Sequence, residues 1–492
     1  MRARELLLAL DQGSSSSRAV LFDLKGHVVA QAQRPVKTRR PKAGWVEHDP
    51  LNLAVSLEEA LDAVLSKLSS KDLVLGAGLA VQRSTIVFCD RSSLKPIAPA
   101  PSWMDARAVD IIAPLQDRKD EIRGLSGLYP TPYYSAPKIR WFLDHDGKVR
   151  ALAEQGRLLC APVSTFIAAR LTKGLAVAVD PTCAQRTLLM NLSSLAWDPV
   201  LLGLFGLSAE LLPSIQPSAG DWGQIVRKGR SIPLLATLGD QQSAALGLGA
   251  SSEGDAALNY GTGAFLLRHT GSAPLHAPGL LASAAATAGP LRGYFLEGTV
   301  HAVGTSFEWL RDNLGLMKDV RAVDAAFRAS KRRVMVLPAI AGLGAPRWDY
   351  KTKTAFFGLD SQTRSCDMVR GTAEGLCLLL ADAAAVMASS GASVTRARVA
   401  GGLSRSNAMM AFQADALGAT LERRQEVEAT ALGAAILAAK AAGVADAEKM
   451  AEARVEKTFT PCSDDAERAK RRAEWTTFVE STQRLSRDIN LS

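Results

Sequence analysis

Two apolar runs near the N-terminus flank a short polar stretch, and this pattern predicts a pair of strands joined by a loop. The runs are Leu6–Leu10 and Ala19–Phe22, and residues 11–18 between them read DQGSSSSR. Gly13 lets the backbone turn and approach a ligand, while hydroxyls and free N–H groups suit phosphate oxygens. Asp11, at the end of a buried strand, is suited to hold a hydrated Mg²⁺. The stretch is therefore either a nucleotide phosphate loop or a serine-rich hairpin turn.

The pattern that follows predicts a mixed sheet covered by helices. A third strand is expected at Val28–Gln31, a helix at Leu51–Leu68 and a buried strand at Leu73–Val81. This β-β-β-α-β order is typical of a sheet with helices packed on it. Polar residues just past such strand ends face a ligand crevice. Residues 150–235 are predicted to be mostly helical.

The same pattern begins again near residue 233. A strand at Pro233–Leu238 precedes Asp240. A strand at Ala256–Tyr260, a glycine and hydroxyl turn and a strand at residues 264–267 then resemble the N-terminal loop. We therefore expect two domains, residues 1–248 and 249–492, whose two turns hold one nucleotide between them.

The C-terminal third adds a turn at Gly342–Pro346 and a glycine turn at residues 399–407 that opens a helix through Leu417. N–H groups at such a helix start favour anions. A small-residue helix is expected at Thr430–Ala442, and the last 35 residues are predicted to form a solvated helical tail.

Composition excludes several classes of protein. At 492 residues the chain is too long for one core. Its charge of +9 is scattered and only 6% of residues are aromatic, which argues against nucleic-acid binding. The six cysteines and six histidines show no metal or disulfide spacing, so buried free thiols are expected. The apolar runs at Leu6–Leu10 and Gly375–Ala388 are too short for a signal peptide or a membrane span. We expect a cytoplasmic protein.

Eight motifs in order make the chain similar to the FGGY carbohydrate kinases, and among them to the glycerol kinases. They run from Leu8 to Asn407 and cover over 80% of the chain: LALDQGSSSSRAV, GWVEHDP, VQR, YYSAPKIRWFLDH, GDQQSAALG, YGTGAF, GLGAPRWD and AGGLSRSN. The resemblance implies an α/β fold of two actin-like, ribonuclease-H-like domains flanking a deep cleft for ATP and substrate. It also implies ATP-dependent phosphorylation of a terminal hydroxyl of glycerol or a similar polyol, which gives sn-glycerol 3-phosphate if the acceptor is glycerol.

The resemblance also assigns site residues. Asp240 is implied as the general base, and the alternative interpretation is an N-cap of the following helix. Asp11 is implied to hold Mg²⁺ through water. The implied acceptor-binding residues are Arg83, Ser84, Trp103, Tyr133, Asp240, Gln241 and Phe265. The implied nucleotide-binding residues are Ser14, Ser15, Ser16, Arg18, Gly261, Thr262, Gly304, Glu308, Gly402 and Ser406. Core or surface packing is the alternative for Arg83 and the aromatic residues.

Several positions depart from the glycerol kinase pattern. Ser84 stands for a glutamate, Glu308 for a glutamine, Ser406 for an asparagine and Ala400 for an aspartate. Because a carboxylate accepts charge-assisted hydrogen bonds from polyol hydroxyls, Ser84 leaves open another acceptor, such as a pentitol, tetritol or ketose. The segment before Pro233 is shorter than the effector-binding loop of regulated bacterial glycerol kinases.

Two alternatives stay open, one for the function and one for the assembly. A nucleotide-binding sensor without catalysis is the alternative from another class, although both expected carboxylates, Asp11 and Asp240, are present. The expected partners are ATP and a small polyol or sugar, and no nucleic acid. For the assembly, a homodimer and a homotetramer are both left open.

Overall fold

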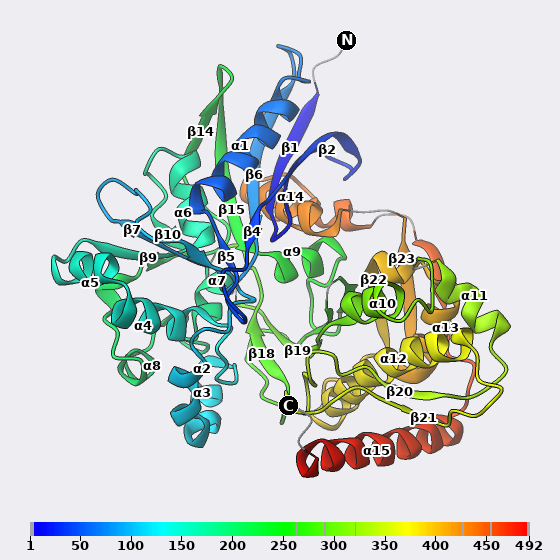
Figure 1. The fold of residues 1–492 in the computed structure, drawn as a ribbon. Helices are drawn as coiled ribbons and strands as arrows, with labels where there is room; N and C mark the ends of the chain where they lie inside the picture. Colours follow the sequence, from blue (N-terminus) through cyan, green and yellow to red (C-terminus); the bar gives the residue numbers. More distant parts are fainter. Residues whose placement is uncertain are drawn as a thin grey trace.

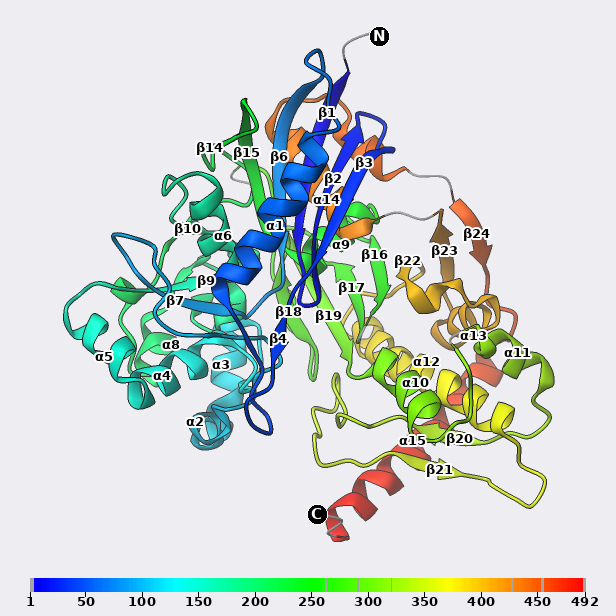
Figure 2. The same ribbon diagram turned by 45° about the horizontal axis from the view of Figure 1, so that its top comes forward.

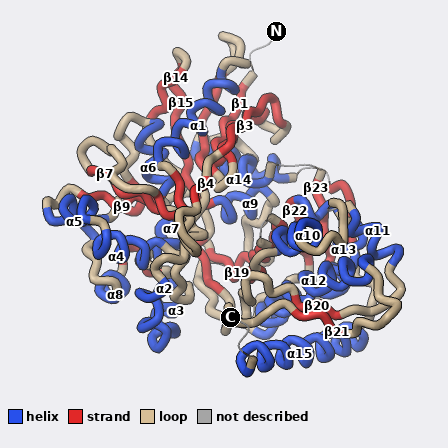
Figure 3. The backbone as a smooth tube through the Cα atoms, in the orientation of Figure 1, coloured by secondary structure: helices blue, strands red, loops and turns tan. Residues whose placement is uncertain are grey.

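Two β-sheets, each covered by helices, form the two halves of the protein (Figure 1). The computed structural model describes residues 4–261, 263–289, 292–319, 321–425, 428–452 and 455–489. Strands gather in two groups with helices around each (Figure 3).

The first sheet has six strands in the order β14-β15-β6-β1-β2-β3. Its strands are β1 (Glu5–Gln12), β2 (Ser16–Asp23), β3 (Val28–Pro35), β6 (Leu73–Val81), β14 (Gln224–Arg227) and β15 (Arg230–Gly239). β1 pairs antiparallel with β2 and parallel with β6, which pairs parallel with β15. The predicted strands are confirmed, and several are longer than the apolar runs because ladder pairing continues into polar residues such as Asp11 opposite Arg18.

The second sheet has seven strands in the order β18-β19-β17-β16-β22-β23-β24. They are β16 (Ala256–Tyr260), β17 (Ala264–His269), β18 (Leu281–Ala284), β19 (Tyr294–Val300), β22 (Arg396–Gly401), β23 (Thr420–Arg424) and β24 (Val455–Phe459). The antiparallel series β19-β17-β16 continues into parallel β22 and β23, as β3-β2-β1 continues into β6 and β15. The predicted repetition of one plan is thus confirmed at the level of topology. The division at residues 248 and 249 stays a prediction.

Helices cover both sheets. They are α1 (Pro50–Leu65), α2 (Val109–Ile112), α3 (Lys119–Ser126), α4 (Ser135–His145), α5 (Gly147–Glu154), α6 (Val163–Leu171), α7 (Pro181–Ala184), α8 (Pro199–Leu204), α9 (Asp240–Gly247), α10 (Val303–Asp312), α11 (Ala322–Ala329), α12 (Ser365–Ser389), α13 (Asn407–Leu417), α14 (Ala429–Ala441) and α15 (Asp465–Asp488). Short 3₁₀ segments are η1 (Ala113–Arg118), η2 (Gln185–Thr187), η3 (Ala209–Leu211), η4 (Gly402–Arg405) and η5 (Ala447–Ala451). The expected helices at 51–68, 407–417 and 430–442 are confirmed as α1, α13 and α14.

Helix α14 belongs to the C-terminal half of the sequence but packs on the first sheet, beside β1, β6 and α9 (Figure 2). Small residues make this approach close. A Cβ atom on Gly78 of β6 would lie 2.1 Å from the carbonyl oxygen of Ala434. One on Gly433 would lie 1.8 Å from the carbonyl oxygen of Ser243 in α9. The small-residue composition of α14 is therefore required by its contact with the N-terminal half.

The prediction that residues 150–235 are mostly helical is wrong. Leu158–Pro162 is a fully buried strand, β9, paired with β7 (Ile86–Asp90). A short continuous apolar run fits a buried strand as well as a helix, so periodicity did not separate them. Residues 224–239 form the β14–β15 hairpin, closed by Lys228 and Gly229, both with positive φ. Other short pairs are β10 (Ala178–Val179) with β13 (Ser214–Ile215) and β11 (Met190–Asn191) with β12 (Ala196–Trp197).

Two further small sheets lie outside the main ones. They join β4 (Thr38–Arg39) to β5 (Glu47–His48) and β8 (Ala100–Pro101), and β20 (Met335–Leu337) to β21 (Ala355–Phe357).

The predicted C-terminal helix is present as α15, but it is not solvated on all sides. Trp475, Val479 and Thr482 are buried against the second half of the protein. The indole Nε1 of Trp475 donates to the Asp382 carboxylate over 3.2 Å. The high charge of this segment concealed a narrow apolar face.

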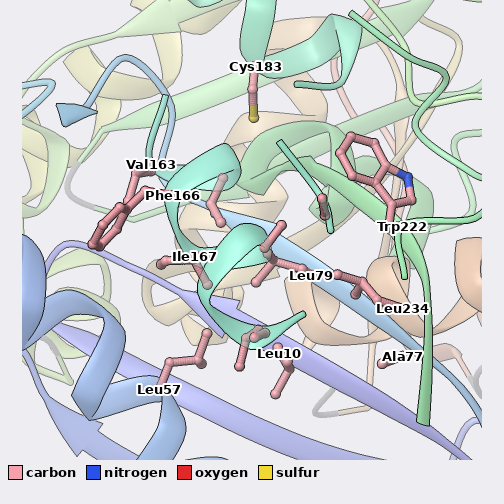
Figure 4. Close-up of a cluster of buried hydrophobic side chains, with 14 of the residues drawn as sticks. Leu10, Leu57, Ala77, Leu79, Val163, Phe166, Ile167, Cys183, Trp222 and Leu234 are labelled. Carbon is pink, nitrogen blue, oxygen red and sulfur yellow. The ribbon is translucent and has the colours of Figure 1, made fainter. Parts of the chain in front are cut away.

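Aliphatic and aromatic side chains between the first sheet and helices α1 and α6 form one of the cores (Figure 4). The expected free thiols are confirmed: all six cysteines are free, and four of them are buried. Cys366 is half-buried and Cys462 is exposed.

Candidate active site

Three strand ends of the first sheet lie at one edge and carry Asp11, Arg83 and Asp240. In the ladder, Val81 of β6 is paired with Gln12 of β1 on one side and with Gly239 of β15 on the other. Because these strands are parallel, the residues that follow them emerge together. Three residues far apart in the sequence thus meet at one edge.

The loop between β1 and β2 has the predicted strand–turn–strand form. The N–H of Gly13 donates to the carbonyl oxygen of Ser16 over 2.9 Å. Trp103 Nε1 donates to Ser14 Oγ over 2.8 Å, so the loop also contacts a residue predicted for the acceptor. Ser15 is exposed and Ser16 is half-buried. Arg18 Nη1 pairs over 2.5 Å with Glu428, the residue that precedes α14.

Asp11 has the character of a cation ligand. Its carboxylate is half-buried, and among the described residues it has neither a hydrogen bond nor an ion pair within 4 Å. Burial raises its pKa to about 7, and the carboxylates of Asp240 and Glu428 add to this, whereas Arg18 opposes it. A divalent cation would relieve this desolvated charge, and Mg²⁺ in proteins is bound by one or two carboxylates, water and substrate phosphates. The donor set therefore fits Mg²⁺, and no cluster of three or more metal-binding side chains is found in the described ranges.

Asp240 is the first residue of α9 and does not cap it. The N-cap is Gly239, and Asp240 Oδ1 accepts a hydrogen bond from the N–H of Gln241 over 2.8 Å. The alternative interpretation of Asp240 as an N-cap is therefore wrong. Burial raises the pKa of this carboxyl group, and Arg83 opposes the shift. A carboxylate with raised pKa is a better proton acceptor than an ordinary aspartate.

Arg83 connects Asp240 to a buried group that the sequence did not reveal. Its side chain is 9% exposed, with Nε 3.3 Å from Asp240 Oδ1 and Nη1 3.6 Å from Glu297 Oε2. Glu297, on β19, is 1% exposed and forms an ion pair with Arg186 of η2. The two arginines hold the pKa of Glu297 at about 2 although burial opposes them. The signal for this cluster was a single charged residue in the otherwise apolar strand YFLEGTV.

Ser84 has a backbone conformation and a hydrogen bond of its own. Its φ is +64°, and its Oγ donates to the carbonyl oxygen of Arg186 over 3.1 Å. Its own carbonyl oxygen accepts from Lys138 Nζ over 3.0 Å and from Ser135 Oγ over 3.2 Å. The Ser84 turn is therefore fixed from three sides.

The remaining residues predicted for the acceptor lie around this turn and on β17. Tyr133 is half-buried just before α4, and its ring centroid is 6.3 Å from that of Tyr350. Phe265 of β17 is opposite Asn259 of β16, whose Nδ2 lies 3.5 Å from Gln241 Oε1. Trp103 contacts Ser14 in the loop between β1 and β2.

Residues predicted for the nucleotide lie at two places in the C-terminal half. The turns at Gly261 and Gly402 follow β16 and β22, which are parallel neighbours with Tyr260 opposite Gly401. A Cβ atom on Gly401, where φ is +95°, would lie 1.9 Å from the carbonyl oxygen of Tyr260, so only glycine fits there. Thr262 lies outside the described residues.

The other nucleotide candidates are on helices. Gly304 and Glu308 are one turn apart on α10, and Glu308 is exposed. Ser406 is the N-cap of α13: its Oγ accepts from the N–H of Met409 and donates to Asp324 over 2.6 Å. Because this hydroxyl already bonds to Met409 and Asp324, its role in this structure is to cap α13.

Comparisons with known proteins match both halves of the chain. Residues 6–247 match the N-terminal domain of the FGGY family of carbohydrate kinases, and residues 256–442 match its C-terminal domain. The chain is 37% identical over 489 residues to glycerol kinase of Pasteurella multocida, covering 96% of this chain and 97% of that protein. It is also 37% identical over 494 residues to glycerol kinase of Salmonella arizonae, covering 98% of each.

Solved structures show the same fold. Plasmodium falciparum glycerol kinase with ADP superimposes with a TM-score of 0.91 at 27% identity, covering 98% of this chain and 99% of that chain. A Brucella ovis xylulose kinase gives 0.88 at 22% identity, covering 98% and 100%. The predicted α/β class of two actin-like domains is thus confirmed.

Helix α12 is long and apolar. Ser365–Ser389 is long and apolar enough by composition to cross a membrane, and 67% of its apolar window is buried inside the protein. The expectation that the apolar stretch is too short to span a membrane is wrong in length, because residues 375–388 are only part of a 25-residue helix. The burial of this helix is that of a core helix.

Proposed function

Because the chain belongs to the FGGY family of carbohydrate kinases, we propose that it transfers the terminal phosphoryl group of ATP to a primary hydroxyl of glycerol or of a similar polyol. The observation that carries this proposal is the meeting of Asp11, Arg83 and Asp240 at one sheet edge. A kinase needs a held phosphate chain, a metal-binding carboxylate and a base beside the acceptor.

In the proposed reaction Asp240 accepts the proton of the attacking hydroxyl. The hydroxyl oxygen forms a bond to the terminal phosphorus as the bond from that phosphorus to the bridging oxygen breaks, and ADP leaves. Arg83 orients the acceptor through its guanidinium N–H groups, together with Trp103, Tyr133, Gln241 and Phe265. If the acceptor is glycerol, the product is sn-glycerol 3-phosphate.

The phosphate groups of ATP are assigned to the two turns. Ser14, Ser15, Ser16 and Arg18 serve from the first half, and Gly261 and Thr262 from the second. Gly304, Glu308, Gly402 and Ser406 are assigned to the ribose and base. Asp11 would hold Mg²⁺ through water, and the ion would supply positive charge that offsets the negative charge of the phosphate oxygens.

A second acceptor class is favoured by the Ser84 turn. In place of the glutamate of glycerol kinases, Ser84 offers a short hydroxyl that donates to Arg186. The carboxylate that pairs with Arg83 on its other side, Glu297, is 1% exposed and therefore buried behind the arginine. The shorter Ser84 leaves more space and no carboxylate. A larger acceptor that fits this space, such as a pentitol, tetritol or ketose, is therefore the alternative substrate. We place the enzyme in the cytoplasm, and a homodimer or homotetramer remains a prediction.

A screen of acceptors with purified protein tests the proposal. ADP release is followed with Mg²⁺-ATP and glycerol, erythritol, ribitol, xylitol or a ketopentose, each against a blank without acceptor. Turnover of glycerol supports the first acceptor class. Turnover of a pentitol or ketose with negligible glycerol activity overturns glycerol as substrate, and absence of turnover with any acceptor favours a nucleotide sensor.

A further inference from the structure

Beneath the candidate base lies a buried cluster of charges contributed by both halves of the protein. Resting on the proposed kinase function, we propose that Glu297 is a positioning residue for the acceptor site. Its carboxylate holds Nη1 of Arg83 on the side away from Asp240, so that Arg83 approaches Asp240 through Nε alone and its guanidinium keeps the orientation that faces the acceptor.

The Glu297 carboxylate is fixed by partners on several elements. Arg186 of η2 forms an ion pair with it, and Ser283 of β18 donates to Oε2 over 2.9 Å. Arg186 Nη2 also donates to Ser283 Oγ over 2.7 Å, which closes the triangle. Thr299, on the same strand, lies 3.4 Å from Oε1. A carboxylate with so many donors is rigid and charged, and it therefore presents a fixed anion to Arg83.

Arg83 is shared between two acids. Glu297 approaches Nη1, and Asp240 approaches Nε. Gln242 Oε1 accepts from Nη1 over 3.3 Å, while the Nε2 of Gln242 is buried without a partner. The four charges of Arg83, Arg186, Glu297 and Asp240 balance, two positive and two negative. No single acid holds Arg83 in the two-bond geometry that makes such pairs strong.

Loss of the Glu297 charge would leave the cluster with two positive charges and one negative charge. Two buried guanidinium groups would then share Asp240 as their acid, and Arg83 would turn to it. Arg83 already lowers the pKa of Asp240 and the Glu297 charge raises it, so loss of the Glu297 charge would lower that pKa further. Asp240 would become a weaker base, and Arg83 would leave the acceptor.

Several charged or titratable groups surround Asp240, and only Glu297 is replaced in the comparison below. The charged or titratable groups that face it or its arginine partners are Asp11 on β1, Arg83 after β6, Tyr134 before α4, Cys183 on α7, Arg186 on η2 and Glu297 on β19.

Glu297→Gln tests the inference because it removes the charge and keeps the shape. Glu422→Gln is the matched control, since Glu422 on the same sheet also approaches two arginines, Arg396 and Arg398, at 3.5 and 3.7 Å. The measurements are kcat and KM for acceptor and for ATP from pH 5 to 9, with thermal unfolding as the test of folding. For Glu297→Gln we expect kcat/KM for the acceptor to fall about tenfold or more and its acidic limb to move down by about one pH unit. KM for ATP should not change, and Glu422→Gln should match the wild type.

Several outcomes would overturn the inference. They are wild-type acceptor kinetics in Glu297→Gln, or a lower melting temperature with an unmoved acidic limb, which would mark a structural role only. If this variant does not fold, Ser283→Ala decides: a severalfold higher acceptor KM supports the inference, and an unchanged KM overturns it. If the wild-type protein phosphorylates no acceptor, the proposed kinase function is refuted, and the inference that rests on it is refuted as well. An active wild type with an unaltered variant overturns the inference alone.

Discussion

The hydroxyl of Ser84 donates a hydrogen bond to the carbonyl oxygen of Arg186, and so the residue expected to recognise the acceptor is also bound to the backbone of η2. Ser84→Glu would place a carboxylate beside Arg83. Charge-assisted hydrogen bonds contribute about 1.5–3 kcal/mol each, so KM for glycerol should fall about tenfold or more in steady-state assays. Serine and glutamate both carry a Cβ atom, so the positive φ at position 84 destabilises the two variants to a similar extent.

Ser84→Ala is the control for that change, because it removes the hydroxyl and adds no charge. Its KM for glycerol should stay within about twofold of the wild type, as the hydroxyl is directed at the backbone. An unchanged KM in Ser84→Glu would mean that another group already recognises those hydroxyls.

Asp240→Asn should remove the proton acceptor and leave the site's shape intact. General base catalysis contributes about 100- to 10,000-fold, so kcat should fall within that range in the ADP-release assay. ATP affinity measured by calorimetry should be unchanged. Asp221→Asn, an exposed aspartate that caps a turn by accepting from the N–H of Gly223, is the control. A kcat within a few-fold of the wild type in Asp240→Asn would refute the assigned role.

Asp11 predicts a dependence of stability on pH in the protein without ligands. Its pKa is about 7 in the folded protein against an ordinary value of 3.8. A carboxyl group with raised pKa stabilises the fold below its unfolded pKa, and this contribution is lost as pH rises through about 7. Asp11→Asn should therefore have a higher melting temperature than the wild type at pH 8 and little difference at pH 4.

The same variant tests the metal assignment without an activity assay. Mg²⁺ with ADP should raise the melting temperature of the wild type more than ADP alone does, by mass action. In Asp11→Asn this extra increase should disappear, while the increase with ADP alone persists. An equal effect of Mg²⁺ on both proteins would place the ion elsewhere.

Gly433→Ala should loosen the contact between α14 and α9. The added Cβ would lie 1.8 Å from the carbonyl oxygen of Ser243, and overpacking of this kind costs about 1–3 kcal/mol. Chemical denaturation should show the loss. Gly203→Ala in α8 is the matched control, since its Cβ would meet nothing within 4 Å. That variant should be unchanged or slightly more stable, because alanine favours helices over glycine.

Hydrophobic pattern predicted the elements that local sequence determines. Strand Leu73–Val81 and the hairpin at residues 256–269 have long apolar runs bounded by turns, and their types followed directly. Between residues 172 and 216 the conformation of the chain is instead fixed by hydrogen bonds to individual side chains. Asp180 and Asp198 each accept two or more N–H or hydroxyl groups and so fix very short elements. No periodicity marks such segments.

For the site, the sequence placed residues at strand ends but did not reveal partners from distant segments. Asp11, Arg83 and Asp240 each lie at or just after the end of a buried strand, and the structure brings these three positions together, while their assigned roles stay predictions. Arg186 and Glu297 are 111 residues apart in sequence, and only the folded arrangement of the two halves pairs them. Ser406 shows the reverse case, since its match to a motif did not reveal that its hydroxyl caps α13.

The position of α14 bears on how the protein is made. The first sheet is complete in sequence once α9 ends at Gly247, yet one of its faces is covered by a helix that ends at Ala441. At about 5–20 residues per second, a ribosome needs roughly 10 to 40 s to synthesise the segment between them. During that time the apolar side chains on the face of β1 and β6 that α14 covers stay exposed to solvent. A chain truncated after α9 should therefore be prone to aggregation, and adding the α14 segment in trans should improve its solubility.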